Sequence, residues 1–138
     1  TQGSEAVAIG YAAGTTSQSS NAVAVGPYAG QTTQGSEAVA IGYAAGTTSQ
    51  GESAVAVGQQ AGKTNQGDEA IAIGANAGIT NQAANSIIIN ATGTTLNNIV
   101  EDVFIVKPVR GVAGAGLPAG FKQVAYNPTT GEFIYYDM

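Results

Sequence analysis

The sequence of 138 residues contains no cysteine, no histidine and no tryptophan, and its charged residues are few. Without cysteine the chain can form neither a disulfide framework nor a thiolate metal site. Without histidine it lacks the commonest general base and a frequent metal ligand. The formal net charge of −5 gives no electrostatic reason to bind nucleic acid, so we expect no nucleic-acid partner. No apolar run approaches the roughly 20 residues that a membrane helix needs, so we also expect no direct membrane insertion.

What the chain does contain is one repeated motif. The pentad Ala-Val-Ala-Ile-Gly at residues 6–10 recurs every 16 residues, with Val and Ile exchanging, and a sixth, altered copy lies at residues 86–90. A fixed period with one motif per copy is typical of a repeat architecture. The chain also begins inside a repeat and without an initiator methionine, which predicts a fragment of a longer protein.

The pentad predicts a β-strand. Ala alternates with Val or Ile, which sends the branched side chains to one face and the alanines to the other. A helix is the competing interpretation because Ala is plentiful, but each glycine costs a helix about 1 kcal/mol and branched residues favour a strand. We therefore predict an all-β parallel solenoid, with residues 1–96 forming six coils about 4.8 Å apart. We expect the branched residues to fill the coils as the structural core: Val7, Ile9, Val23, Val25, Val39, Ile41, Val55, Val57, Ile71, Ile73, Ile87 and Ile89.

When the 16-residue repeats are aligned, equivalent residues form columns, and three further columns support this interpretation. Glutamine recurs from Gln2 to Gln82 in every copy and fits a ladder of amide hydrogen bonds along the rod. Two columns of glycine predict the turns of each coil, because glycine adopts backbone conformations that other residues avoid. The turn glycines are Gly10, Gly14, Gly26, Gly30, Gly42, Gly46, Gly58, Gly62, Gly74 and Gly78.

Large side chains are scarce in this array, so a single column of coils is expected to be only marginally stable. The alanine face of each strand is small and flat, which suits the close approach of a second copy of the same backbone. We therefore predict an obligate homo-oligomer that associates through its alanines.

The pentad and its flanking residues resemble the head repeats of trimeric autotransporter adhesins, the YadA-like family, whose signature is Asn-Ser-Val-Ala-Ile-Gly. The closest matches are residues 85–90 and 21–26, although the serine of the signature is alanine in five of the six copies. The resemblance implies a left-handed parallel β-roll and a homotrimer whose chains pack about one axis.

The last part of the chain, residues 97–138, differs in composition. Six of the nine aromatic residues lie there. Residues 103–106 are expected to form a strand, residues 111–120 a Gly/Ala loop, and residues 121–126 and 132–136 a β-hairpin. A segment this short cannot bury its aromatic side chains alone, so we interpret it as a trimerising base. The residues assigned to that base are Phe104, Phe121, Tyr126, Phe133 and Tyr135.

This segment also resembles the end regions of trimeric viral and phage fibres. In those regions a Phe-x-Val-x-Pro-x-Arg strand precedes a Tyr-Asn-x-Thr-Thr-Gly-Glu hairpin, and the matching residues here are 104–110 and 126–132. A cleavable chaperone domain often follows in such fibres, whereas bacterial adhesin heads continue into a neck and a heptad stalk, and no heptads appear here. We therefore expect part of a trimeric fibre on the virion surface that attaches a virus to a host cell. The alternative is the head of a bacterial cell-surface adhesin.

Tyr11, Tyr28 and Tyr43 are candidate receptor contacts. Exposed tyrosines on a polar rod can stack on sugars, and a host surface glycan or protein is the expected receptor. The favoured alternative is that they pack against the neighbouring coil or chain. A second alternative function, an ice-binding solenoid, rests on the threonine column from Thr16 to Thr80, but the neighbouring positions are too varied to form a second threonine rank.

No other motif carries chemistry. Residues 58–64 suggest a phosphate-binding loop, but one residue is missing between the glycines. Asn90-Ala91-Thr92 is a glycosylation sequon. No nucleophile–base set and no paired acids share a column, so we expect no enzyme, no metal site and no cofactor.

Overall fold

The described chain consists of strands, turns and loops. The computed structural model describes residues 1–109 and 123–136, and these residues contain β-strands and no helix. The chain divides after Pro108 into two compact units.

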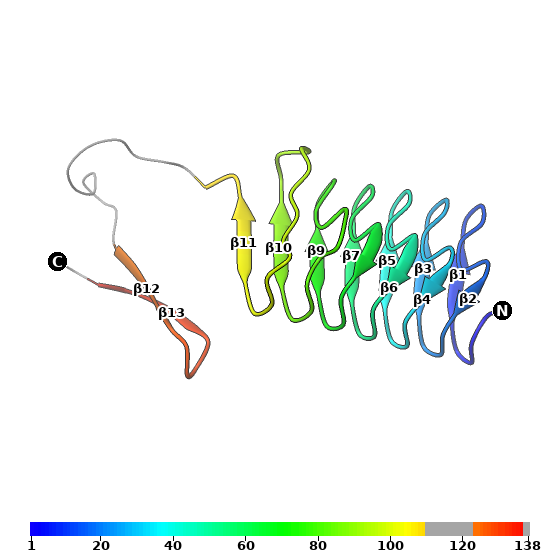
Figure 1. Cartoon of the computed structure of the whole chain (residues 1–138), viewed down its shortest axis with the longest axis horizontal. Coiled ribbons are helices and arrows are strands. Elements are labelled where there is room, and N and C mark those ends of the chain that lie inside the picture. The colour runs from blue at the N-terminus through cyan, green and yellow to red at the C-terminus, as the bar shows by residue number, and fades with distance from the viewer. Residues whose placement is uncertain (110–122, 137–138) are drawn as a thin grey trace. The chain divides into compact units, whose positions relative to one another are not determined.

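The first unit is a parallel β-solenoid of about six turns with about 16 residues per turn (Figure 1). This confirms the predicted solenoid and its period. One wall is a seven-stranded sheet, formed in this order by β1 (Val7–Ile9), β3 (Val23–Val25), β5 (Val39–Ile41), β7 (Val55–Val57), β9 (Ile71–Ile73), β10 (Ile87–Asn90) and β11 (Phe104–Lys107). A second wall is a four-stranded sheet of β2 (Ser17–Gln18), β4 (Thr33–Gln34), β6 (Thr48–Gln50) and β8 (Thr64–Gln66).

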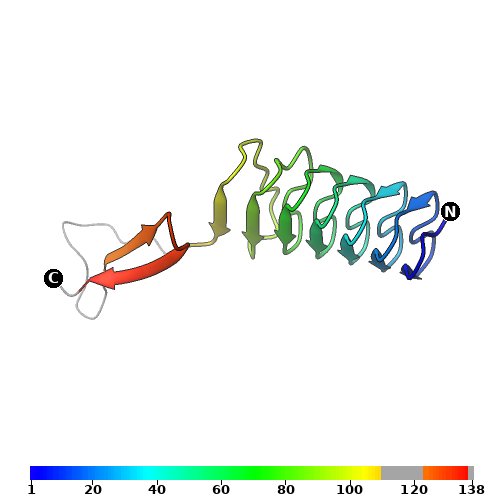
Figure 2. The same cartoon turned by 90° about the horizontal axis from the view of Figure 1, so that it is seen from below.

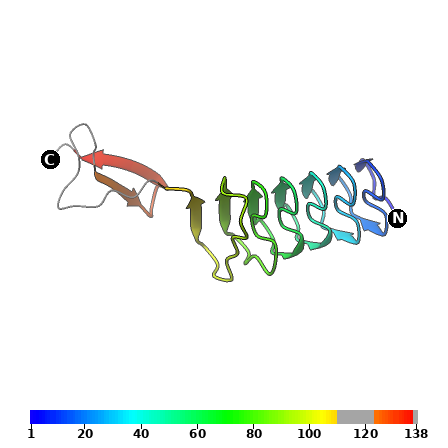
Figure 3. The same cartoon turned by 90° about the horizontal axis from the view of Figure 1, so that it is seen from above.

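The coils stack in chain order with equivalent residues side by side (Figures 2 and 3). Val7 pairs with Val23, and Val23 pairs with Val39. Each column of the sequence repeat therefore becomes a continuous rank of side chains along the rod. The rank continues past the last pentad, because Phe104 of β11 pairs in parallel with Ile87 of β10. The sequence places a boundary between residues 1–96 and 97–138, whereas the structure keeps β11 in the solenoid unit.

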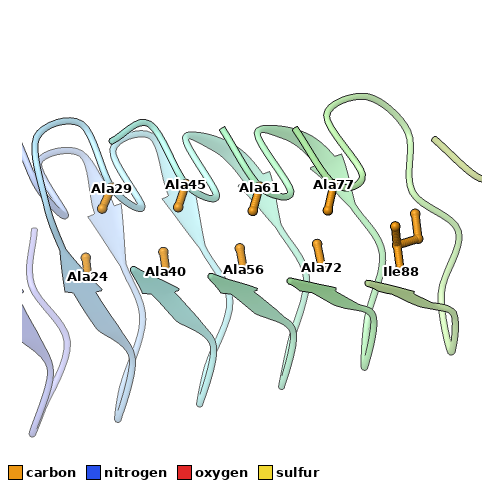
Figure 4. Packing of buried hydrophobic residues seen from close by; sticks show 9 residues of the cluster. All are labelled: Ala24, Ala29, Ala40, Ala45, Ala56, Ala61, Ala72, Ala77 and Ile88. Atoms are coloured by element: carbon orange, nitrogen blue, oxygen red, sulfur yellow. The ribbon is translucent and has the colours of Figure 1, made fainter. Parts of the chain in front are cut away.

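Alanine, not valine or isoleucine, fills the interior of the coils. Ala24, Ala40, Ala56 and Ala72 of the long sheet are completely buried, and in Figure 4 they point across the coil toward Ala29, Ala45, Ala61 and Ala77 of the opposite bend. The predicted core of Val and Ile residues is therefore wrong. Their side chains lie on the outer face of the sheet, where Ile41 and Ile73 are each 40% exposed although the alanines beside them are completely buried.

The narrowness of the coil explains this inversion. A Cβ atom placed on Gly46 would lie only 3.2 Å from the Cβ of Ala40 across the coil, so the two walls are about one methyl group apart. A branched side chain has no room there without moving the backbone, and overpacking a tight interior destabilises it. Since side chains alternate along a strand, the inward alanines force the branched residues outward.

Larger apolar side chains enter the described interior where the repeat changes at its C-terminal end. Ile88 occupies the alanine column and is completely buried (Figure 4). Leu96 pairs with Ala77 through an isolated bridge and packs against the same cluster. Asn90 replaces the pentad glycine of this coil and is also buried.

Buried glutamines join successive coils. The Nε2 of Gln34 donates hydrogen bonds to the carbonyl oxygen of Val23 in the preceding coil, at 2.8 Å, and to that of Ala38 in its own coil, at 3.1 Å. The same pair of bonds recurs at Gln18, Gln50, Gln66 and Gln82. Direct amide-to-amide bonds of 3.2 Å link Gln50 to Gln66 and Gln66 to Gln82. The main partners of the glutamine column are thus backbone carbonyls, and the predicted amide ladder is confined to its C-terminal part.

The bends of the coil depend on left-handed backbone conformations. Gly42 has φ of +127°, and a Cβ there would lie 2.7 Å from the carbonyl oxygen of Gly58 on the next coil. Gly46, with φ of +51°, makes room for the side chain of Gln50, whose Oε1 would lie 2.7 Å from an added Cβ. Residues other than glycine also adopt positive φ, including Glu37 at +61° and Tyr28 at +61°.

The second unit contains one antiparallel strand pair. β12 (Gln123–Asn127) pairs with β13 (Glu132–Tyr136), with Tyr126 opposite Phe133. The turn is closed by a hydrogen bond from the Gly131 amide to the Asn127 carbonyl oxygen, at 2.8 Å.

Candidate functional site

The main candidate site is an exposed apolar surface on the outside of the seven-stranded sheet. It consists of the outward Val and Ile side chains of β1, β3, β5, β7, β9 and β10 together with Phe104 and Val106 of β11, and we call it the apolar face. The side chains form two parallel ranks, because the first and third residues of each strand point the same way. Neither rank contains a polar or charged residue.

The exposure of the apolar face varies along the sheet, and the valines of β3 and β7 are half-buried. Ile41 and Ile73 are each 40% exposed, Ile89 is 36% exposed and Val106 is 37% exposed. Apolar surface left in water costs about 25 cal/mol per Å² relative to burial. Contiguous apolar patches on soluble monomers are usually limited to a few hundred Å², and larger ones mark interaction sites. An uninterrupted face over seven strands is therefore a surface suited to association.

A second candidate site is a cluster of tyrosines at the bend that follows the long sheet. The ring centroids of Tyr11 and Tyr28 lie 5.4 Å apart with an angle of 82° between the ring planes, and those of Tyr28 and Tyr43 lie 5.9 Å apart at 86°. These edge-to-face contacts join three successive coils into what we call the tyrosine ladder. Each such pair contributes about 0.5–1.5 kcal/mol beyond area burial.

The tyrosine ladder combines packing with exposure. The predicted contact with the neighbouring coil is present, yet Tyr11 remains 74% exposed and Tyr43 49% exposed. Within the described residues, none of the three phenol hydroxyls has a hydrogen-bond partner inside the chain. The two interpretations offered by the sequence therefore do not exclude each other.

The residues assigned to a trimerising base fall in different parts of the structure. Phe104 belongs to β11 of the solenoid and is 49% exposed, so it extends the apolar face. Tyr126 and Phe133 form a ring pair with centroids 5.0 Å apart on the β12–β13 pair, and each is 57% exposed. Phe121 and the side chain of Tyr135 lie outside the described residues. The trimerising role of this group stays a prediction.

The structure also shows where the threonine column and the glycosylation sequon lie. The threonine column lies along the four-stranded sheet, where Thr48 pairs with Thr64. Asn90 of the sequon is buried, and its Nδ2 donates to the carbonyl oxygens of Ala75 and Thr94 at 2.9 and 2.7 Å. Because both amide hydrogens are used inside the fold, Asn90 cannot carry a glycan in the folded protein.

The outward orientation of the branched residues is the feature that sequence reasoning missed. A signal for it is present in the repeats. The columns of Ala24 and Ala29 hold alanine in every one of the first five coils, whereas the columns of Val7 and Ile9 exchange valine and isoleucine. A column that holds side chains of one size is expected where the interior space is limiting. A column that holds side chains of two sizes is expected at a surface.

The fold defines the chain as a parallel β-solenoid repeat protein with a continuous apolar outer face. Comparison with known protein families, with curated proteins and with solved structures found no match. Among the described residues no group of three or more acidic side chains could hold a metal ion. The same part of the chain contains no helix long and apolar enough to cross a membrane.

Proposed function

We propose that this chain is a structural attachment module, part of a homotrimeric fibre or spike on a virion surface that binds a host cell. The single observation that supports it most strongly is the apolar face, which runs over β1 to β11 without a polar interruption. A surface of this kind requires a partner of matching length and repeat. Two further copies of the same chain meet both conditions, because their ranks have the same spacing.

The proposed trimer differs in one respect from the sequence expectation. The alanines that were expected to meet another copy are buried inside the coil, and the outward Val and Ile side chains take that place. Three such faces turned toward a common axis bury the branched residues in the centre of a left-handed β-roll trimer. The arrangement also accounts for the alanine interior, since the large apolar side chains then contribute their burial between chains and not within one.

The mechanism of such a module is mechanical and multivalent. Parallel coils about 4.8 Å apart form a stiff rod that holds surface sites away from the particle. Three chains present each site three times, and linked weak sites gain avidity by factors of about 10² to 10⁴.

The viral assignment is supported by residues 104–110 and 126–132, whose pattern resembles the ends of viral and phage fibres. Immuno-electron microscopy with antibodies against residues 1–108 tests it. We expect label on projections of virus particles. Label on a bacterial cell envelope supports the adhesin-head alternative, and label confined to the cell interior contradicts both.

The association itself is tested with charges in the centre of the apolar face. We expect Ile41→Lys combined with Ile73→Lys to abolish the trimer, because each lysine must then be buried without a partner. Ser17→Lys combined with Thr80→Lys adds the same charge at two exposed positions outside the long sheet and serves as the control. Light scattering after size exclusion measures both, and equal masses for the two variants contradict the proposed interface.

A further inference from the structure

The tyrosine ladder has features of a ligand-binding surface that association of the chains does not explain. The ranks of the apolar face continue through every coil, as an interface along the rod requires. The ladder does not continue in this way. In the fourth and fifth coils the corresponding positions hold Gln59, Gln60, Ala75 and Asn76, and Gln59 is exposed.

This change of residue type indicates that the bend faces water along the rod. An apolar interface at that bend would demand apolar residues in the fourth and fifth coils as well. The aromatic residues of the first three coils therefore form a local patch on an otherwise polar bend. Aromatic side chains kept on a solvated surface are typical of binding sites.

The surroundings of the tyrosine ladder are neutral. From Tyr11 to Thr16, and at the equivalent positions of the next two coils, there is no charged residue. The acidic residues of these coils, Glu5 and Glu37, precede the long-sheet strand, whereas the tyrosines follow it, so about 10 Å of strand separates them. The polar neighbours are hydroxyl and amide groups, among them Thr47, whose Oγ1 lies 3.3 Å from the carbonyl oxygen of Tyr28.

We propose that the tyrosine ladder is a carbohydrate-binding site for a neutral oligosaccharide that lies along the rod axis. The C–H faces of pyranose rings stack on the exposed tyrosine faces, and sugar hydroxyls bond to the unpartnered phenol groups and to the neutral rim. Tyr11 and Tyr43 are two coils apart, about 10 Å, which suits a short oligosaccharide and not a single sugar. This inference deepens the proposed attachment function by naming the chemical class of the receptor.

The backbone geometry of the fourth coil allows the tyrosine ladder to be extended by a substitution. The amide of Tyr28 donates to the carbonyl oxygen of Tyr11 at 2.8 Å, and the amide of Gln60 donates to that of Tyr43 at the same distance. Gln60 also shares the left-handed conformation of Tyr28, with φ of +57° against +61°. A tyrosine at position 60 is therefore expected to lie against Tyr43 as Tyr28 lies against Tyr11.

The experiment uses the full chain on an array of neutral oligosaccharides of several linkages together with their sialylated counterparts, followed by NMR titration with the best neutral binder. We expect binding to neutral sugars that falls about tenfold or more in the Tyr11→Ala, Tyr43→Ala double variant. Gln60→Tyr is expected to strengthen binding a few-fold. The Ser17→Ala, Thr33→Ala double variant, which changes two exposed positions of the four-stranded sheet outside the ladder, is the matched control and is expected to bind like the unaltered chain.

Three results overturn the proposal: no binding to any neutral oligosaccharide, binding that the double variant retains, or preference for sialylated sugars. Binding of a proline-rich peptide to the ladder in place of sugars overturns it as well, since aromatic surfaces also recognise such peptides. Light scattering on the same samples separates the two proposals. An intact trimer without sugar binding contradicts the ladder alone, whereas a monomer that binds sugar contradicts the trimer alone.

Discussion

The two faces of each pentad strand differ in what they tolerate. In the first five coils the inner face carries alanine only, because the opposite wall of the coil is about one methyl group away. The outer face carries valine and isoleucine in exchange, because nothing within the same chain confines it. The comparison indicates that the inner face determines whether a coil can form, whereas the outer face determines what the finished rod associates with.

The largest expected effect comes from enlarging the inner face. We expect Ala56→Leu to lower the free energy of unfolding by about 3 kcal/mol or to prevent folding, because the interior of β7 has no space for the added atoms. Thermal unfolding followed by circular dichroism at fixed protein concentration measures the change.

The matched control lies next to it on the outer face. Val57→Ile adds volume to the same strand on the side where other coils already hold isoleucine, and we expect a change within about 0.5 kcal/mol. Equal destabilisation by the two substitutions contradicts the assignment of inner and outer faces.

A smaller effect is expected in the glutamine column. Gln66 donates to Val55 and Ala70 and exchanges amide bonds with Gln50 and Gln82, so we expect Gln66→Leu to cost about 2 kcal/mol.

Gln18 provides the comparison for this prediction. Its Oε1 is buried without a hydrogen-bond partner, and its replacement therefore removes fewer interactions. We expect Gln18→Leu to cost about 1 kcal/mol in chemical denaturation. A larger cost at Gln18 than at Gln66 contradicts the role given to the amide bonds between glutamines.

The smallest expected effect concerns the turns. Glu37 has φ of +61°, a conformation that asparagine adopts more readily, and Asn21 occupies the same place in the preceding coil with φ of +59°. We expect Glu37→Asn to stabilise the protein by about 0.5 kcal/mol and Asn21→Glu to destabilise it by a similar amount. Melting temperatures that move in the same direction for both variants contradict this explanation.

Much of the fold follows from the sequence, because the 16-residue period predicts in-register coils and the two glycine columns lie where the chain bends. Which side of the strand points into the coil does not follow from alternation alone. Alternation separates Ala from Val without saying which set is inside, and the usual preference for burying branched residues gives the wrong answer when a coil is this narrow. The placement of β11 was missed for a related reason, since its 17-residue offset from β10 hides it from a strict 16-residue count.

The candidate sites were predictable to different degrees. The tyrosines stand out in the sequence because aromatic residues are rare in the array. Their edge-to-face contacts are harder to predict, because Tyr28 lies one column away from Tyr11 and Tyr43. The apolar face was hidden because its residues were assigned to the core.

The proposed trimer requires two further copies of the chain to cover the apolar face. Sedimentation equilibrium over a range of concentrations tests this directly. We predict a single species with three times the 13.6 kDa mass of one chain. A folded monomer that persists at micromolar concentration, with the Val and Ile ranks open to solvent, contradicts it.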